Sequence, residues 1–370
     1  MLGHKRIPSR EGGVEIVVEE LSKRMVRQGH AVTCYNRKGH HIGGAEFDRA
    51  RQKEYEGIRL KTVATLDKKG LAAMTSSFTA AFACAFSKCD VVHFHAEGPC
   101  AMLWLPRLFR KRCIATIHGL DHQRAKWGFL ARTYIMLGEK CAARFAHEII
   151  VLSKGVEDYF LERYGRSTHF IPNGVDRPAL LEPELITRQL GLKPRGYLLY
   201  LGRIVPEKGL TYLVEAFRQV KTDKKLVIAG GASDTGDFFE ELKALAAGDD
   251  RICFTGFVEG QLLQELYSNA YLYTLPSDLE GMPLSLLEAM SYGNCCLTSD
   301  IPECTQVVED QGVTFRKGDT EDLRHQLQQL CDRPETVERY RRTAAEHVCK
   351  KYSWDDVTEK TLALYYGEKP

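Results

Sequence analysis

Four charged residues in the C-terminal half of the chain are of the types that could act together on a phosphorylated ligand. Arg203 and Lys208 lie in one glycine-bounded segment, and Glu280 and Glu288 bracket the start of another. The guanidinium group of Arg203 offers a planar set of donors, and the ammonium group of Lys208 offers a point charge. Together these two groups are expected in a site that binds a diphosphate. Carboxylates are poor phosphate ligands but accept hydrogen bonds from hydroxyl groups, for example those of a sugar and a ribose. A solvated basic turn remains the alternative for Arg203 and Lys208 taken alone.

The segment that carries the two glutamates has the pattern of a strand, an acidic turn and a helix. Residues 270–275 form an apolar run, and residues 283–292 predict a helix. The first turn of a helix presents unbonded N–H groups and the positive end of the helix dipole, which together favour an anion. The sequence therefore predicts that an anion binds where this helix begins.

A second loop could contact a flat base. Residues 254–260 end a strand-like run in a glycine turn, and we expect Phe257 and Val258 to be exposed to a cleft there. An ordinary strand–helix turn is the alternative explanation.

The N-terminal half offers a smaller set of candidates. Gly12 and Gly13 precede a helical pattern and could bring backbone N–H groups close to an anion. His118 follows a strand-like run, so we expect it at the same cleft, although a lone histidine is more often structural. Of His93 and His95, we expect one to line the cleft and one to pack, without a metal. No Asp-x-Asp pair is found for a metal–nucleotide complex, so cationic side chains are expected to neutralise the phosphates instead.

Strand-like and helical stretches alternate along both halves of the chain, which is typical of doubly wound parallel sheets. The strand-like runs of the first half are residues 31–35, 58–63, 90–94, 113–117 and 148–152, and those of the second half are residues 197–201, 226–229, 252–255, 270–275 and 295–298. The predicted architecture is two Rossmann-like α/β domains that face each other across a cleft. We place the domains at residues 1–175 and 196–350, with a linker at 176–195 and a C-terminal helix at 351–370 that crosses back to the first domain.

One strand is missing from this pattern. Only Met1 and Leu2 precede the loop that begins at Gly3, where a first strand should lie. We favour the interpretation that the recorded start is late, because the loop is otherwise intact. Loss of a buried parallel strand would affect stability and the placement of Gly13.

Composition indicates a globular protein without a nucleic-acid partner. The chain has 370 residues and a formal net charge of +2, which gives no global attraction for nucleic acid. We find no spanning segment and no secretory signal. The 12 cysteines lack paired-ligand spacing, so buried reduced thiols in a cytoplasmic protein are expected, with a structural zinc site as the alternative.

Basic and aromatic residues cluster in residues 107–112 and again in residues 122–132. The first cluster is most simply a solvated helix end. The second includes Trp127 and Phe129 among its charges, as a helix at an anionic membrane surface would.

These motifs resemble those of the retaining glycosyltransferases of family 4, which have the two-domain GT-B fold. The resemblance covers essentially the whole chain, and its most specific part is the Glu-x7-Glu motif from Glu280 to Glu288. The segment from Arg203 to Lys208 and the hinge at 171–176 are also typical. Residues 3–13 are similar to those of a bacterial branch that builds surface polysaccharides and includes rhamnosyltransferase-like members.

The resemblance implies a role for each candidate. Arg203 and Lys208 would hold the donor diphosphate and stabilise it as the leaving group, while Glu280 would bind the transferred sugar and Glu288 the ribose. His118 would lie near the sugar. The remaining donor-binding residues would be Phe257 and Val258 at the base, Gly281, Met282, Pro283 and Leu284 through backbone N–H groups, and Gly12 and Gly13 from the other domain.

The expected activity is transfer of a sugar from a nucleotide diphosphate sugar to a hydroxyl group, with retention, without a metal or other cofactor. The acceptor would be a saccharide or a lipid-linked saccharide, at the inner face of the cell membrane. Two alternatives remain: an epimerase of nucleotide sugars with the same fold, and a regulator that binds a nucleotide sugar without turnover.

Overall fold

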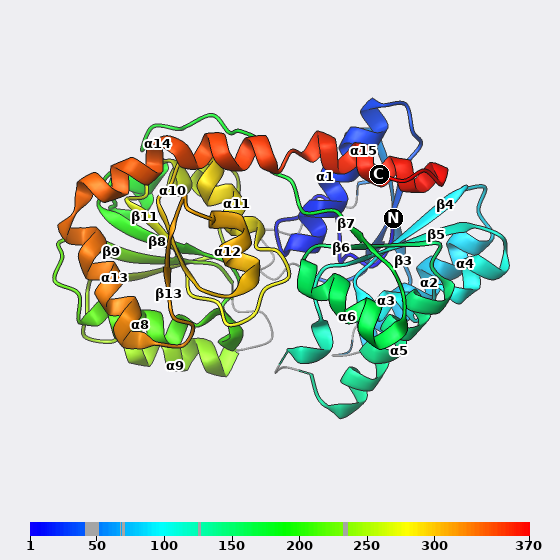
Figure 1. Ribbon diagram of the computed structural model, residues 1–370, viewed down its shortest axis with the longest axis horizontal. Helices are drawn as coiled ribbons and strands as arrows, with labels where there is room; N and C mark the ends of the chain where they lie inside the picture. Colours follow the sequence, from blue (N-terminus) through cyan, green and yellow to red (C-terminus); the bar gives the residue numbers. More distant parts are fainter. Residues whose placement is uncertain (41–51, 67, 69–70, 125–126, 232–235) are drawn as a thin grey trace. The chain divides into compact units, whose positions relative to one another are not determined.

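The computed structural model describes the whole chain except residues 41–51, 67, 69–70, 125–126 and 232–235. It divides into two compact units (Figure 1). The N-terminal unit consists of Met1–Asn173 together with Trp354–Pro370, and the C-terminal unit is Gly174–Ser353. Each unit contains parallel sheet covered by helices, which confirms the predicted α/β class.

The C-terminal unit is built on a six-stranded parallel sheet. Its strands are β8 (Tyr197–Leu201), β9 (Lys225–Ala229), β10 (Ile252–Gly256), β11 (Leu272–Leu275), β12 (Cys296–Ser299) and β13 (Val313–Phe315). Their spatial order is β10-β9-β8-β11-β12-β13. Consecutive apolar residues of β8, such as Leu198 and Leu199, are fully buried, as expected for a parallel strand covered on both faces.

Helices cover both faces of this sheet (Figure 1). One face carries α8 (Leu210–Arg218), α9 (Gly236–Ala246) and α13 (Thr320–Asp332), and the other carries α10 (Gly260–Asn269), α11 (Leu284–Ser291) and α14 (Pro334–Lys351). Helix α12 (Pro302–Val308) follows β12.

The stretch 176–195, expected to be a linker, groups with the C-terminal unit and contains helix α7 (Leu185–Leu190). Glu265 of α10, fully buried, holds this segment by accepting the backbone N–H groups of Glu184 at 2.9 Å and Ile186 at 3.0 Å.

The N-terminal unit has two ladders of strands with a two-residue segment between them. The ladders are β1-β3-β2 and β4-β5-β6-β7. Their strands are β1 (Thr33–Arg37), β2 (Glu54–Tyr55), β3 (Ile58–Val63), β4 (Val91–His95), β5 (Arg112–Ile117), β6 (Glu148–Val151) and β7 (His169–Phe170).

Met1 and Leu2 take the place of the expected first strand. The N–H of Leu2 donates to the carbonyl of His93 at 3.0 Å, and the N–H of His95 donates to that of Leu2 at 2.9 Å. On the other side, the N–H of Tyr35 donates to the carbonyl of Met1 at 3.1 Å. Two residues therefore join the two ladders, and Leu2 is fully buried.

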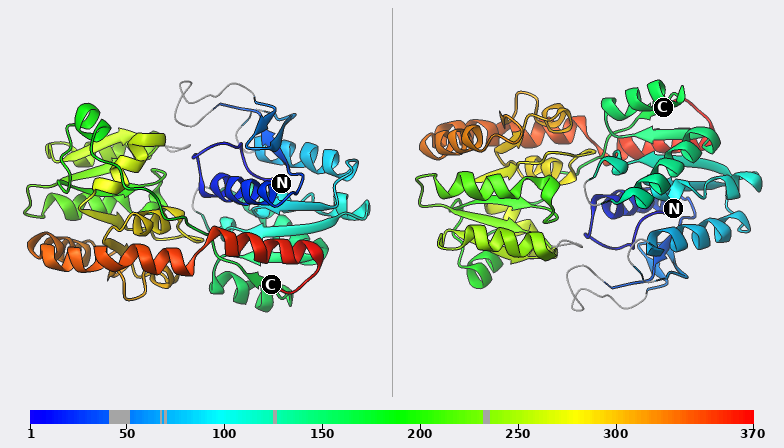
Figure 2. Two further views of the ribbon diagram at one scale, coloured as in Figure 1. Left: turned by 90° about the horizontal axis from the view of Figure 1, so that it is seen from above. Right: turned by 90° about the horizontal axis from the view of Figure 1, so that it is seen from below.

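The helices of this unit include one from the far end of the chain. They are α1 (Gly13–Arg27), α2 (Leu71–Ala85), α3 (Glu97–Cys100), α4 (Trp104–Leu108), α5 (Phe129–Phe145), α6 (Lys154–Tyr164) and α15 (Trp354–Tyr366). Helices α1 and α15 lie side by side (Figure 2), joined by an ion pair between Arg24 and Asp355 at 2.9 Å. The Tyr365 hydroxyl of α15 also contacts His93 Nδ1 at 2.6 Å.

All 12 cysteines are free thiols, and eight of them are buried. Among the described residues, no helix is both long and apolar enough to cross a bilayer.

Candidate active site

The charged residues predicted from the sequence gather where the strand order of the C-terminal sheet reverses. Strands β8 and β11 are neighbours in the sheet, although β9 and β10 separate them in the sequence. In space, β9 and β10 lie on the other side of β8. The loops that follow two such strands diverge to opposite faces, and in open α/β sheets ligands bind at this switch point. Lys208 belongs to the loop after β8, and Glu280 belongs to the loop after β11.

Lys208 and Glu280 form a direct ion pair between Nζ and Oε1. Their side chains are only 13% and 9% exposed. A second link joins the same two loops, because the N–H of Asp278 donates to the carbonyl of Glu207 at 2.9 Å. The Tyr212 hydroxyl of α8 donates to Asp278 Oδ1 at 2.9 Å. The two loops therefore form one connected structure around the ion pair.

Gly209 sets how closely these loops approach. Its φ of +65° lies in the left-handed region, and a Cβ at this position would stand 2.1 Å from the carbonyl oxygen of Pro276. Only glycine meets both conditions without strain or a clash. The glycine that ends the Arg203–Lys208 motif thus allows Lys208 to reach Glu280.

Arg203 is half-buried at the start of the same loop. The Tyr200 hydroxyl of β8 donates to the backbone carbonyl of Arg203 at 2.8 Å, which fixes the backbone there. Burial raises the pKa of Tyr200 well above its ordinary value, so this hydroxyl remains a donor.

Helix α11 begins at Leu284, one residue later than predicted, with Pro283 as its N-cap. The N–H groups of Leu286 and Leu287 both donate to the Pro283 carbonyl, at 3.1 and 3.2 Å. Because these two N–H groups are already paired, an anion would accept hydrogen bonds from the N–H groups that precede them at the start of the helix. Pro283 cannot contribute one, because proline lacks an N–H, so its predicted role as a backbone donor is wrong.

Glu288 lies in the second turn of this helix and is half-buried. Its Oε2 accepts a hydrogen bond from the hydroxyl of buried Tyr267 at 3.2 Å. Glu280 and Glu288 therefore differ in setting: one is paired with a cation and the other with a neutral hydroxyl.

The predicted base contact is only partly possible. Phe257 is half-buried, but Val258 is only 7% exposed, so the expectation that both side chains are exposed is wrong for Val258. Val258 directly precedes Glu259, the N-cap of α10, and Leu263 in the first turns of that helix is also buried. An apolar residue in this position commonly packs back on the helix, and that signal was available in the sequence.

In the N-terminal unit, Gly12 is the N-cap of α1 and Gly13 its first residue, so the helix begins one residue earlier than predicted. Two buried carboxylates that the sequence reasoning missed accompany them. Glu15 Oε1 accepts the N–H of Lys5 at 2.7 Å, and Glu11 Oε2 pairs with Arg6 Nε at 3.2 Å. The start of α1 thus already has an acidic residue in its first turn, which satisfies part of the charge preference of the helix end.

His118 follows β5 and contacts a buried histidine, with 3.2 Å between its Nε2 and His95 Nδ1. Burial lowers the pKa of His118 to about 4, so its imidazole is neutral near pH 7. His93 and His95 are both buried and their rings stack at 4.1 Å. The expectation that one of these two lines a cleft is therefore wrong.

Comparison with known proteins assigns this arrangement to a family. The sequence model described as "Glycosyltransferase Family 4" matches residues 11–177, and the one described as "Glycosyl transferases group 1" matches residues 184–347. Alpha-maltose-1-phosphate synthase of Mycobacterium tuberculosis is 26% identical over 333 residues, which cover 81% of this chain and 84% of that protein. O-antigen chain mannosyltransferase B of Escherichia coli is 29% identical over 204 residues, 54% of this chain and 52% of that protein.

The solved structure of Anabaena Alr3699/HepE in complex with UDP and glucose has a TM-score of 0.82 to this chain, at 16% identity, and covers 98% of both chains. The fold is thus that of the GT-B glycosyltransferases, as the resemblance predicted. The two family matches, one in each unit, show that the chain belongs to the family 4 glycosyltransferases.

Proposed function

We propose that this protein transfers a sugar from a nucleotide diphosphate sugar to an acceptor hydroxyl, with retention of anomeric configuration. The observation that carries the proposal is the Lys208–Glu280 ion pair at the switch point of the C-terminal sheet. The pair combines an ammonium group, a type of cation that binds phosphates, with a carboxylate, which accepts hydrogen bonds from hydroxyl groups. The UDP and glucose named for the HepE complex support a donor of this class.

In this proposal the chain acts mainly on the leaving group. Lys208, Arg203 and the first N–H groups of α11 stabilise the negative charge that develops on the diphosphate as the bond to the sugar breaks. Glu280 accepts hydrogen bonds from hydroxyl groups of the sugar, and Glu288 accepts hydrogen bonds from those of the ribose. The acceptor hydroxyl attacks the oxocarbenium-like carbon from the leaving-group face, and a diphosphate oxygen takes its proton. Cationic side chains neutralise the diphosphate, so no metal is needed on the donor.

A donor screen followed by turnover assays tests the proposal. The full chain is screened against nucleotide sugars by thermal shift, since a ligand at 100 times its dissociation constant adds about 2.7 kcal/mol of stability. The best donor is then tested for transfer and hydrolysis with the wild type, Lys208→Met and Arg203→Ala. We expect each variant to lose about 10²–10³-fold in turnover, as for loss of one transition-state donor.

A matched control is Lys243→Met, which removes an exposed lysine of α9 that pairs with Glu240 at 2.9 Å. Turnover of Lys208→Met within a few-fold of this control contradicts the proposal. Isomerised donor formed without an acceptor indicates an epimerase, and tight donor binding without turnover on any acceptor indicates a regulator.

We further propose that the N-terminal unit rests on an anionic membrane surface, where a lipid-linked saccharide would be presented. The support is an exposed aromatic row that the sequence reasoning did not identify. Phe78, Phe82 and Phe86 stand one helical turn apart along α2 and its end, and are 48%, 51% and 61% exposed. The row continues to Phe109, whose ring centroid lies 4.5 Å from that of Phe86.

The basic cluster predicted at 107–112 borders this aromatic row. Arg110 is exposed beside Phe109, while Lys111 Nζ is held by the carbonyls of Ser87 and Cys89, at 2.7 and 2.8 Å. In the second predicted cluster, 122–132, Phe129 is 82% exposed, and residues 125–126 lie outside the described part. Basic residues near an anionic surface contribute about 1 kcal/mol each.

Co-sedimentation with lipid vesicles tests the membrane proposal. We expect the full chain to bind vesicles of phosphatidylcholine with phosphatidylglycerol better than phosphatidylcholine alone. Phe82→Ser and Phe86→Ser should each weaken binding about fivefold or more, as expected for loss of about 1 kcal/mol of buried apolar surface. Leu161→Ser, at a 54% exposed leucine of α6, is the matched control. Equal binding by all these variants contradicts the proposal.

A further inference from the structure

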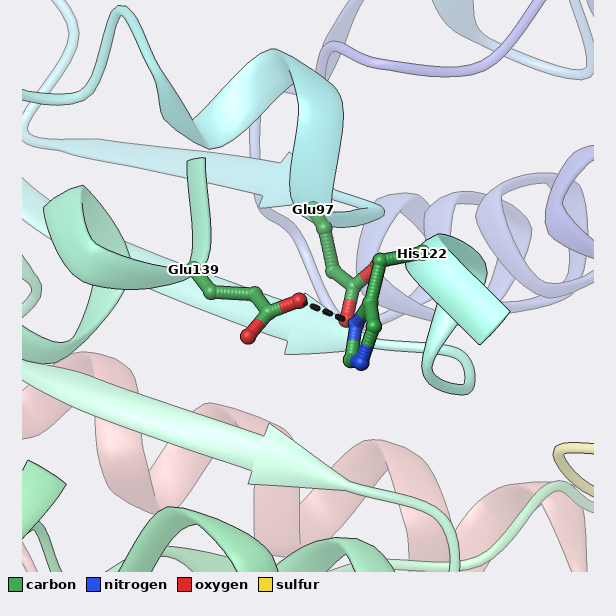
Figure 3. Close-up of side chains that lie close together, drawn as sticks. All are labelled: Glu97, His122 and Glu139. Carbon is green, nitrogen blue, oxygen red and sulfur yellow. Dashed lines mark ion pairs between the residues drawn. The ribbon is translucent and has the colours of Figure 1, made fainter. Parts of the chain in front are cut away.

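Three ligand-type side chains from separate elements converge inside the N-terminal unit (Figure 3). Glu97 opens α3 directly after β4, His122 lies in the 3-10 turn Asp121–Gln123, and Glu139 lies in α5. One ligand atom from each lies within 4.8 Å of the other two. Both carboxylate side chains are fully buried.

In both carboxylates, the oxygen Oε2 accepts hydrogen bonds from other described residues. Glu97 Oε2 accepts the N–H of Asp121 at 2.7 Å, and Glu139 Oε2 accepts the hydroxyls of Tyr159 at 2.8 Å and Tyr164 at 3.0 Å. These bonds fix the orientation of both carboxylates, as bonds from outer residues fix the ligands of metal sites.

The atoms left over are those that face one another. In the described part of the chain, Glu97 Oε1, His122 Nδ1 and Glu139 Oε1 are all buried and lack a hydrogen-bond partner. His122 Nδ1 approaches Glu139 Oε1 to 2.6 Å, but the contact does not have the alignment of a hydrogen bond. Buried polar atoms rarely remain unpaired, so three that converge on one point indicate a missing partner.

In the described part of the chain, only one basic side chain accompanies the two carboxyl groups. Within the described residues, no lysine or arginine forms an ion pair with Glu97 or Glu139, and His122 is the only basic group in contact. Burying carboxylates without a counter-charge is costly, and a cation between them removes that cost.

The backbone of two helices is arranged to bring the carboxylates together. Gly138 precedes Glu139 in α5, and a Cβ at Gly138 would lie only 2.0 Å from the carbonyl oxygen of Glu97. Glycine therefore lets α5 approach α3 this closely. Ala96, with φ of +73°, turns the chain from β4 into α3 and so directs Glu97 inward.

We propose that Glu97, His122 and Glu139 bind a divalent transition-metal ion, with Zn²⁺ as the best match. One imidazole nitrogen and two carboxylate oxygens are ligands that Zn²⁺ accepts, at about 2.0–2.2 Å. The ligand atoms of a tetrahedral Zn²⁺ site lie about 3.4 Å from one another. Binding therefore lengthens the 2.6 Å contact between His122 Nδ1 and Glu139 Oε1 and moves Glu97 Oε1 toward these two atoms. The ion ties the turn after β5 to α3 and α5. This site is separate from the donor site and does not depend on the proposed transfer reaction.

Metal titration of the full chain tests the inference. The purified protein is stripped with EDTA, and Zn²⁺ binding is measured by competition with a chromophoric chelator, together with the melting temperature. We expect one Zn²⁺ per chain and a higher melting temperature on loading. Glu97→Gln and Glu139→Gln should abolish this stoichiometric binding. Tyr159→Phe, which removes only a hydrogen bond to Glu139, should weaken it about 10–100-fold.

Two controls separate this site from the chain's thiols and from misfolding. Co²⁺ in place of Zn²⁺ should give visible absorption without the strong near-ultraviolet thiolate band that cysteine ligands produce. Glu265→Gln alters a fully buried glutamate in the C-terminal unit and should leave Zn²⁺ binding unchanged. The inference is overturned if the wild type binds no stoichiometric Zn²⁺, which would indicate two carboxyl groups sharing a proton. It is also overturned if folded Glu97→Gln and Glu139→Gln, checked by circular dichroism, bind Zn²⁺ as the wild type does.

Discussion

The ion pair between Lys208 and Glu280 allows a quantitative prediction by a double-mutant cycle. Lys208→Met and Glu280→Gln each remove one charge and nearly preserve side-chain volume. Stranding a fully buried charge costs about 3–5 kcal/mol, and the remaining contact with water at 13% and 9% exposure reduces that cost. We expect each single variant to lose about 2 kcal/mol of unfolding free energy. The double variant strands no charge, so it should lose no more than one single variant, a coupling of about 2 kcal/mol.

The assay uses the distribution of tryptophans. Trp104, Trp127 and Trp354 are the three tryptophans of the chain, and all belong to the N-terminal unit. Tryptophan fluorescence in urea therefore follows that unit, while far-ultraviolet circular dichroism follows both. The variants should shift only the transition seen by circular dichroism and leave the fluorescence transition in place.

A control cycle on Lys243 and Glu240, an exposed pair of α9 at 2.9 Å, should give a coupling below about 0.5 kcal/mol. If the coupling of Lys208 with Glu280 is equally small, the two charges do not depend on each other and the reasoning about the site is refuted.

Three further predictions concern other parts of the chain. Burial lowers the pKa of His4 to about 3 and of His118 to about 4, so between pH 6.5 and 4 only the unfolded chain gains these protons. As the pH is lowered, the unfolding free energy of the N-terminal unit, followed by tryptophan fluorescence, should therefore fall by about 1.4 kcal/mol per pH unit for each histidine. His4→Gln should remove the contribution of His4 to this pH dependence. An unchanged slope in that variant would contradict the prediction. Gly209→Ala should lower the unfolding free energy measured by circular dichroism by at least about 1–2 kcal/mol, because alanine is strained in the left-handed region and its Cβ would clash with the Pro276 carbonyl. Wild-type stability of this variant would show that the two loops can separate freely. Glu265→Ala should lose about 1–3 kcal/mol for each backbone N–H left unpaired, with faster hydrogen exchange at Ile186; unchanged exchange there would show that Glu265 does not hold α7.

Much of the fold followed from patterns that are local in the sequence. The apolar run at 197–201 is a buried strand, and the helix predicted at 283–292 spans Leu284–Ser291. Their residue types, and their positions after strand-like runs, predicted that Lys208 and Glu280 belong to one site. The neighbouring positions of β8 and β11 in the sheet bring the two residues together.

The remaining features depend on non-local contacts that carry no periodic signal. Two residues, Met1 and Leu2, are too few to show a strand pattern, and only their backbone hydrogen bonds on both sides reveal their role. Glu97 and Glu139 meet because Gly138 lets two helices approach, which no spacing rule indicates. Val258 is different, because a local signal was present: an apolar residue just before the N-cap commonly packs on the helix that follows.

The return of the chain to the N-terminal unit has a consequence for synthesis. Residues 1–173 emerge from the ribosome first, but α15 completes this unit only after all of Gly174–Ser353 has been made. Until then His93 lacks Tyr365 and Arg24 lacks Asp355. The C-terminal unit is continuous and can fold on its own emergence. The N-terminal unit, although most of it is synthesised earlier, is therefore completed last, so a chain that stops short of α15 carries a finished C-terminal unit and an unfinished N-terminal unit.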